Sequence, residues 1–186
     1  MRIIAGRARR LPLKAPTGKD TRPTTDRIKE TLFNMLQPDI PGCNFLDLFS
    51  GSGNIGLEAA SRGAKQVVMV ENNKKAADII ADNMAFTHLD DVSSLIRKDA
   101  LVAMQTMKYD EPFDIIFADP PYQLGIEREL LQTIKQTGIL NPNGYVVIEA
   151  DSGTEFDFAE EVGFRIIKEK IYKTNKHVYL DFITCE

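Results

Sequence analysis

From Asn44 onward the chain alternates short apolar runs with longer amphipathic segments, and this alternation is the strongest constraint on its fold. The apolar runs predict buried strands at 45–49, 66–71, 94–98, 113–118 and 145–150. Segments with helical periodicity fill the gaps at 55–61, 74–86, 100–107 and 125–136. Repeated strand–helix units with nearly continuous apolar strands predict an α/β fold whose parallel sheet carries helices on both faces.

The end of the chain follows a different pattern. Residues 164–172 and 176–184 resemble two strands, and only Lys173-Thr174-Asn175 joins them. Such a tight connection predicts an antiparallel pair at the edge of the sheet. A plain dinucleotide-binding sheet normally ends with all its strands parallel, so this hairpin indicates a different class of α/β protein.

Composition narrows the class of protein further. A chain of 186 residues, 43% of them hydrophobic, is expected to form one domain with a small appendage. It contains no apolar stretch of the ~20 residues that span a membrane, and Met1 to Gly6 lacks the apolar core of a signal peptide. Cys43 and Cys185 are expected to be incidental thiols, which favours a cytoplasmic protein. With His88 and His177 they show no metal-ligand spacing, so we expect no metal.

Charge is distributed unevenly along the chain. Residues 1–30 carry a formal charge of +6, and because the whole chain carries −4, the other 156 residues carry −10. A basic arm on an acidic body is typical of a protein with one face toward a polyanion such as RNA. The arm lacks aromatic side chains that stack on bases, so a solvated tail remains an alternative. The acidic segment 151–161 is expected to face away from nucleic acid.

The arm itself is divided into three parts. Residues 3–13 alternate loosely and predict a strand or hairpin, and the Pro- and Gly-containing stretch 14–23 predicts a loop. A helix is expected over 26–36, capped by Thr24 or Thr25. We therefore divide the chain into a basic arm and helix, residues 1–40, and a catalytic domain, residues 41–186.

Asp119-Pro120-Pro121-Tyr122 directly follows the predicted strand 113–118. Ligands of open α/β sheets bind at this carboxyl edge. The acid can accept a hydrogen bond from an amino group, the prolines stiffen the backbone, and the ring can stack on a planar substrate. The four residues therefore suit an exocyclic amino group of a base or amide, although a stiff turn with a helix-capping acid is the alternative.

A second motif joins the first strand of the sheet to its helix. Gly51, Gly53 and Gly56 fit the pattern G-x-G-x-x-G, which lets a ligand approach the backbone closely. Glu71 ends the second strand, where a carboxylate can accept from both ribose hydroxyls, and Asp99 ends the third, where it can accept from an adenine amino group. Asp47 would repel a pyrophosphate and suits a cationic amino-acid tail. Taken singly, each acid can also be a helix cap. Together, they indicate an adenosine pocket.

The chain resembles class I S-adenosylmethionine-dependent methyltransferases that act on amino groups. It is similar in particular to the RsmD family of bacterial 16S rRNA guanine-N2 methyltransferases. Nearly the whole chain takes part in this resemblance. Four stretches carry it: residues 2–6 (RIIAG), 22–33 (RPTTDRIKETLF), 46–53 (LDLFSGSG) and 119–122 (DPPY).

The resemblance implies a Rossmann-like, seven-stranded, mostly parallel sheet with an antiparallel last strand. It implies methylation of one guanine, usually numbered 966, in 16S rRNA of the small ribosomal subunit or its assembly intermediate. The sequence itself does not fix the oligomeric state, and a monomer is favoured. By position, S-adenosylmethionine would be held by Asp47, Phe49, Gly51, Gly53, Glu71, Asn72, Asp99 and Ala100. The guanine amino group would be held by the catalytic residues Asp119, Pro120, Pro121 and Tyr122. RNA would be held by Arg7, Arg9, Arg10, Arg22, Thr24 and Arg27, with a weaker indication for the lysines of 173–176.

Three other functions remain open from the sequence. A DNA adenine-N6 methyltransferase uses the same tetrapeptide, but it usually needs more residues for sequence recognition than this arm supplies. A protein-glutamine methyltransferase usually has Asn in place of Asp119 and needs no basic arm. A non-catalytic RNA-binding module would not need the intact acids and glycines of the cofactor motif.

Overall fold

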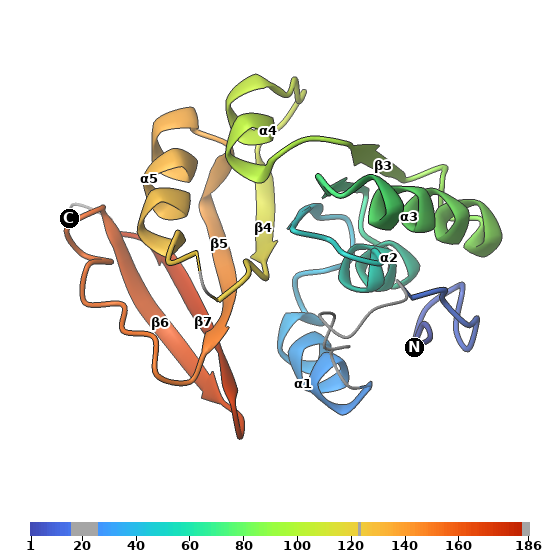
Figure 1. The fold of residues 1–186 in the computed structure, drawn as a ribbon, viewed down its shortest axis with the longest axis horizontal. Helices are drawn as coiled ribbons and strands as arrows, with labels where there is room; N and C mark the ends of the chain where they lie inside the picture. Colours follow the sequence, from blue (N-terminus) through green and yellow to red (C-terminus); the bar gives the residue numbers. More distant parts are fainter. Residues whose placement is uncertain (16–25, 123, 184–186) are drawn as a thin grey trace.

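A computed structural model describes residues 1–15, 26–122 and 124–183. Its centre is a seven-stranded sheet in the order β3-β2-β1-β4-β5-β7-β6 (Figure 1). The strands are β1 (Asn44–Leu48), β2 (Gln66–Val70), β3 (Ser93–Ile96), β4 (Phe113–Ala118), β5 (Leu140–Asp151), β6 (Phe164–Ile171) and β7 (Asn175–Phe182). The helices are α1 (Asp26–Leu36), α2 (Asn54–Ser61), α3 (Lys74–Thr87), α4 (Ala100–Thr106) and α5 (Glu127–Thr137).

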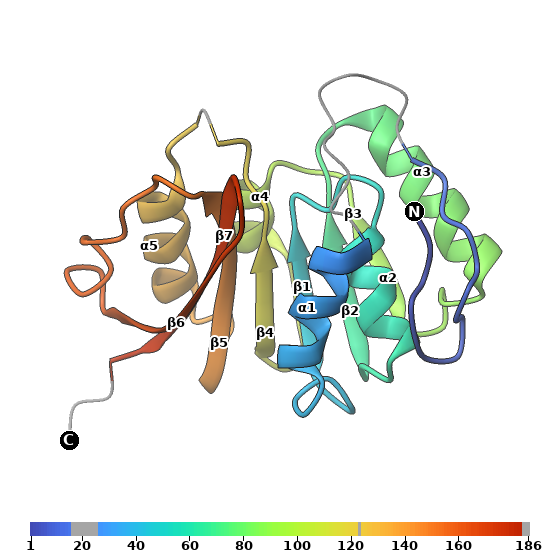
Figure 2. The same ribbon diagram turned by 90° about the horizontal axis from the view of Figure 1, so that it is seen from below.

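Helices cover both faces of the sheet, as the apolar strands predicted (Figure 2). Side chains of α1, α2 and α3 pack on one face against Phe45, Val67 and Ile115. Side chains of α4 and α5 pack on the other face against Leu46, Val68 and Ile116. Because successive strand residues point to opposite faces, these neighbouring residues supply two separate cores.

The terminal hairpin adopts the predicted antiparallel arrangement. β7 lies between β5 and β6 and runs antiparallel to both, whereas the pairs among β1 to β5 are parallel. Since β7 starts where β5 ends, the hairpin tip at 172–174 lies at the carboxyl edge of the parallel strands. This edge is where ligands of α/β sheets bind.

The main difference from the expected elements lies in β5. The sequence predicts this strand at 145–150, but it begins at Leu140. Asn141, Pro142, Asn143 and Gly144 read as turn residues. The backbone nevertheless pairs Phe113 with Leu140 and then shifts its register before Ile115 pairs with Tyr145. Pairing with β4 overrides the local turn preference.

The first residues of the arm fold back against α1 and α2. They form a small hairpin, with a bridge between Arg2 and Pro12 and a hydrogen bond from the Ile3 amide to the Leu11 carbonyl. Ile3, Ala8 and Leu13 are buried in the same core as α1 and α2. The predicted loop at 14–23 lies almost wholly outside the described residues.

A buried ion pair fastens this arrangement. Lys29 of α1 and Glu58 of α2 are both fully buried, with their charged atoms 2.9 Å apart. Glu58 also accepts the amides of Ile4 and Ala5, and Lys29 donates to the Arg2 carbonyl. The stretch 22–33, one of the four that carry the resemblance, therefore contributes a residue that holds the arm on the body.

Candidate functional site

The predicted cofactor and substrate residues meet at the carboxyl edge of β1, β2 and β4. Asp47 of β1 pairs in register with Met69 of β2 and Phe117 of β4, so it lies between the strands that lead to Glu71 and Asp119. The chain order reverses here, because β2 and β3 lie on one side of β1 and β4 on the other. Ligand sites of open α/β sheets form at this kind of switch point.

The turn after β1 has the backbone of a close ligand approach. Phe49, Gly51 and Gly53 have φ angles of 62°, 56° and 76°. Such an angle is unusual for a residue other than glycine, and in the described residues Phe49 shares it with Arg10 and with His88, which caps the end of α3. Nothing lies within 4 Å of where a Cβ of Gly51 would project, so a ligand has room on that side.

Glu71 and Asp47 hold the backbone of this turn through hydrogen bonds to their carboxylates. Glu71 accepts the Gly51 amide at 2.8 Å and the Asn73 amide at 2.7 Å. Asp47 is buried and accepts the Gly56 amide at the start of α2 at 2.9 Å. Burial above all, with the nearby Glu71 charge, raises the pKa of Asp47 to about 7. Carboxyls at these two positions suit a ligand with ribose hydroxyls and an ammonium group, and they disfavour a pyrophosphate.

The other predicted cofactor residues lie at neighbouring strand ends. Asp99 follows β3 and caps α4, because one of its carboxylate oxygens accepts the amides of Leu101 and Val102 at 2.9 and 3.2 Å. The helix-cap alternative therefore applies to Asp99, and its second oxygen is open to another donor. Asn72 is exposed after Glu71, and Ala100 is the buried first residue of α4.

Asp119 to Tyr122 extend from β4 beside this turn. Asp119 is half-buried, Pro120 is buried, and Pro121 and Tyr122 are exposed. Burial, followed by the charges of Glu149 and Asp47, raises the pKa of Asp119 well above its usual range. The tetrapeptide thus presents a partly shielded carboxyl next to an exposed aromatic ring. That combination can hold a planar molecule that carries an amino group.

The structure also contains a polar cluster on β5 and β7 that the sequence did not predict. Glu149 of β5 contacts Asn175 and His177 of β7 and accepts a hydrogen bond from the Tyr122 hydroxyl. The sequence did contain a signal for this cluster, because Glu149 lies near the end of the apolar strand 145–150. A buried charge without a partner is costly there, so a polar partner was to be expected.

The predicted RNA-binding residues have different surroundings. Arg7 is paired with Asp91, whereas the guanidinium groups of Arg9 and Arg10 are exposed and contact no polar group of the described residues. Arg27 is exposed on α1. Arg22 and Thr24 lie outside the described residues. The basic charge of the arm is therefore partly neutralised by the body, most clearly at Arg7.

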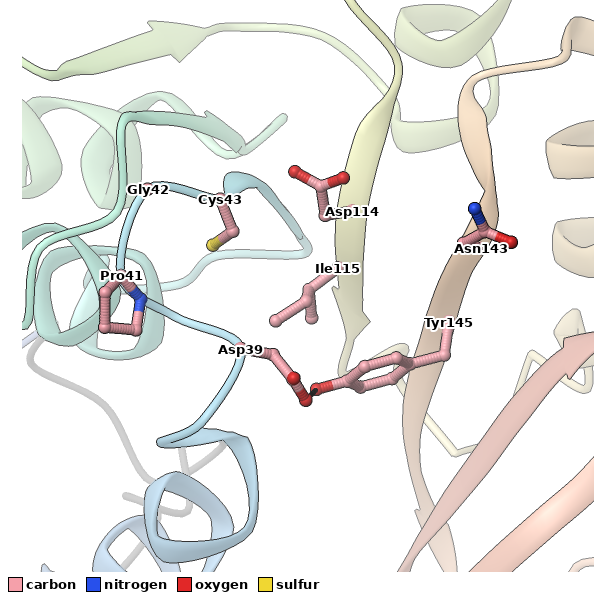
Figure 3. Close-up of a pocket in the computed structure, with 8 residues that line it drawn as sticks. All are labelled: Asp39, Pro41, Gly42, Cys43, Asp114, Ile115, Asn143 and Tyr145. Carbon is pink, nitrogen blue, oxygen red and sulfur yellow. Dashed lines mark hydrogen bonds between the residues drawn. The ribbon is translucent and has the colours of Figure 1, made fainter.

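A separate hollow of about 320 Å³ lies at the opposite edge of the sheet (Figure 3). It opens between Cys43, Asp114 and Tyr145, at the amino ends of β1, β4 and β5. Tyr145 donates a hydrogen bond to Asp39, and burial raises the pKa of the Cys43 thiol to about 12, which disfavours the reactive thiolate. None of the predicted site residues lines this hollow.

Within residues 1–15, 26–122 and 124–183, no group of three or more His, Cys, Asp or Glu side chains is arranged to hold a metal ion. No helix there is both long enough and apolar enough to cross a membrane.

Several known proteins are similar to this chain in sequence and in fold. The family described as conserved hypothetical protein 95 matches residues 1–181. YlbH of Bacillus subtilis strain 168, a candidate rRNA methyltransferase, is 37% identical over 171 residues, covering 91% of this chain and 92% of its own length. Ribosomal RNA small subunit methyltransferase D of Haemophilus influenzae is 34% identical over 173 residues, covering 91% and 88%.

The solved structures agree with the sequence comparisons. The structure of YhhF, a candidate methyltransferase of Escherichia coli, superposes with a TM-score of 0.83 at 28% identity and covers 98% of this chain and 97% of its own. The seven-stranded sheet with antiparallel β7 is the class I methyltransferase fold. The chain therefore belongs to the conserved hypothetical protein 95 family, the RsmD family of small-subunit rRNA methyltransferases.

Proposed function

We propose that this protein transfers a methyl group from S-adenosylmethionine to the exocyclic N2 of a guanine in 16S rRNA, with guanine 966 as the expected target. The observation that carries the proposal is the half-buried Asp119 directly after β4, followed by the exposed Tyr122, on the strand that neighbours β1 and its glycine turn. The similarity to small subunit methyltransferase D of Haemophilus influenzae supports the choice of RNA. A ribosomal substrate also implies a cytoplasmic enzyme.

The cofactor residues act by binding and orientation. S-adenosylmethionine, when bound, supplies an electrophilic methyl group on a sulfonium. Glu71 is suited to the ribose hydroxyls, Asp47 to the ammonium group of the amino-acid tail, and Asp99 to the adenine amino group. The open side of Gly51 allows close contact with the backbone.

The substrate residues make a weak nucleophile more reactive. The lone pair of guanine N2 is delocalised into the ring. Hydrogen bonds from its N–H groups to the Asp119 carboxylate and the Pro120 carbonyl favour a more tetrahedral nitrogen, and stacking on Tyr122 sets the angle of the base. A paired guanine must first be unstacked, and phosphate contacts by the arm offset that cost.

The test uses methyl-labelled S-adenosylmethionine and small ribosomal subunits from a strain without the corresponding methyltransferase. The RNA is digested and the labelled nucleoside identified. Labelled N2-methylguanosine is the expected result. Labelled N6-methyladenosine, or label found only in DNA or protein of the same extract, would overturn the assignment of the substrate.

The Asp119→Ala variant tests the role of the tetrapeptide. It is expected to lower kcat by a factor of about 100 or more, because the amino group loses its carboxylate acceptor. Its affinity for S-adenosylmethionine, measured by calorimetry, should be largely retained. Asp157→Ala, an exposed acid in the acidic segment, serves as the control. Near-normal turnover of Asp119→Ala would show that this carboxyl does not hold the substrate.

A further inference from the structure

Glu149 occupies the position beside Asp119 on the neighbouring strand. β4 and β5 are parallel, and Ala118 pairs in register with Ile148. The next residue of each strand, Asp119 and Glu149, therefore reaches the same level at the carboxyl edge. Glu149 is 5% exposed, so a second carboxyl is buried next to the one expected to hold the substrate.

Two side chains of β7 fix the Glu149 carboxylate. The Asn175 amide donates to one oxygen at 2.6 Å, and the other oxygen lies 3.1 Å from His177 Nε2. His177 is fully buried, and its Nδ1 lies 3.2 Å from the hydroxyl of Tyr172 at the hairpin tip. Glu149 and His177 are register partners in the β5–β7 pair, so sheet geometry holds the contact in place.

The third contact of Glu149 reaches the substrate loop. The Tyr122 hydroxyl donates to Glu149 at 3.3 Å, although Tyr122 as a residue is 40% exposed. The hydroxyl end of the ring is therefore anchored, and part of the side chain remains accessible. A buried carboxylate is costly to a fold even when it is paired. Its contact with an exposed ring at the site suggests a role beyond packing.

Glu149 also acts on Asp119 through its charge. The titratable groups around this point are Asp119 from β4, Asp47 from β1, Glu149 from β5, and the His177–Tyr172 pair from the terminal hairpin. A negative Glu149 beside Asp119 makes Asp119 a stronger hydrogen-bond acceptor.

We propose that Glu149 is a positioning residue for methyl transfer: Asn175 and His177 hold its carboxylate, and it in turn holds the Tyr122 ring and faces Asp119. This inference rests on the proposed function, because the ring and the carboxyl it positions are those expected to bind the guanine.

The experiment compares the wild type with four variants. Glu149→Gln removes the charge and keeps the size, Tyr122→Phe removes only the hydroxyl, and the double variant tests their coupling. Asp151→Asn is the matched control, because it makes the same change at an exposed acid two residues along β5. For each, kcat and KM for small subunits are measured across pH, with the Kd for S-adenosylmethionine. The proteins also carry 3-fluorotyrosine. The fluorine resonance of Tyr122 then reports the surroundings of its ring in the absence of substrate.

Glu149→Gln is expected to lower kcat about tenfold or more and to leave the cofactor Kd within about twofold of wild type. The pH below which kcat falls should move lower in this variant, because Asp119 loses a negative neighbour. Tyr122→Phe should lower kcat without moving that pH. The kcat of the double variant should fall by a smaller factor than the product of the two single-variant factors. The Tyr122 fluorine resonance should shift in Glu149→Gln and not in Asp151→Asn.

An active Glu149→Gln with the kcat, pH profile and fluorine spectrum of Asp151→Asn would overturn the inference and leave the proposed function standing. An equal loss of cofactor affinity and turnover, with an unmoved pH profile, would also overturn it, because Glu149 would then be only structural. If the wild-type protein labels no guanine, the proposed function fails. The fluorine resonance then decides whether Glu149 holds the ring.

Discussion

Individual carboxyls at this site differ mainly in their surroundings. Asp99 is exposed and caps a helix, Glu71 holds two amides of the glycine turn, and Asp47 is buried under the start of α2. Burial raises the pKa of Asp47 to about 7, so its charge changes near neutral pH.

The affinity for S-adenosylmethionine should follow the charge of Asp47. If the carboxylate holds the ammonium of the cofactor, the Kd should tighten as pH rises from 6 to 8 and level off above that, because Asp47 is protonated at the lower pH. Calorimetric titration across this range measures the effect, and Asp47→Asn should bind more weakly with a flatter profile. A wild-type Kd independent of pH would remove Asp47 from the ammonium contact.

The raised pKa of Asp47 should make the cofactor-free protein less stable as pH rises, whereas it should make the cofactor bind more tightly. The folded state holds a proton on Asp47 that the unfolded chain releases near pH 4, so the free energy of unfolding should fall as pH rises toward about 7.

A few specific hydrogen bonds hold the arm on helices α2 and α3. The amides of Arg7 and Ala8 donate to the Ser61 carbonyl and hydroxyl at the end of α2, and the Ser61 hydroxyl donates to the Ala5 carbonyl. Asn83 of α3 pairs with both backbone groups of Lys14 and donates to the Ser52 carbonyl in the glycine turn. The arm and the glycine turn are therefore both held by the buried Asn83.

Gly6→Ala should detach the arm from α2. A Cβ at Gly6 would lie 1.8 Å from the Ser61 carbonyl oxygen, and φ is +83°. We expect a loss of about 2–4 kcal/mol in the free energy of unfolding, from backbone strain and overpacking together. Gly42→Ala is the control, because φ is +81° there and a Cβ would meet nothing within 4 Å. Urea unfolding measures both, and equal losses would show that the contact with Ser61 is not tight.

The molecule as a whole combines a basic arm with an acidic body, but the structure divides the basic residues into two groups. Arg7, Lys14 and Lys29 are paired with Asp91, Asp82 and Glu58 of the body, respectively. Arg9 and Arg10 are exposed without such partners among the described residues. The net charge of the arm therefore overstates what it offers to a phosphate backbone.

RNA binding should depend on Arg9 and Arg10 more than on Arg7. Replacing either Arg9 or Arg10 by Ala is expected to reduce the slope of log affinity against log salt by about one, as for the loss of one phosphate contact. Arg7→Ala should change the slope less, because Arg7 is already paired with Asp91. Affinities for a small-subunit RNA fragment at several salt concentrations test this. Equal slopes for all three variants and wild type would exclude the arm hairpin as the phosphate-binding surface.

The sequence alone determined the strand–helix order, the terminal hairpin, the glycine turn and the strand-end position of Asp119, because these depend on periodicity and turn chemistry within short windows. It misjudged the start of β5, where pairing with β4 continues through turn-like residues. Only the tertiary structure decided that Glu149 meets His177 and Asn175, that Lys29 pairs with Glu58, and that Arg7 meets Asp91. These contacts join residues 26 to 84 positions apart. They follow from strand order, register and helix packing, which no local pattern records.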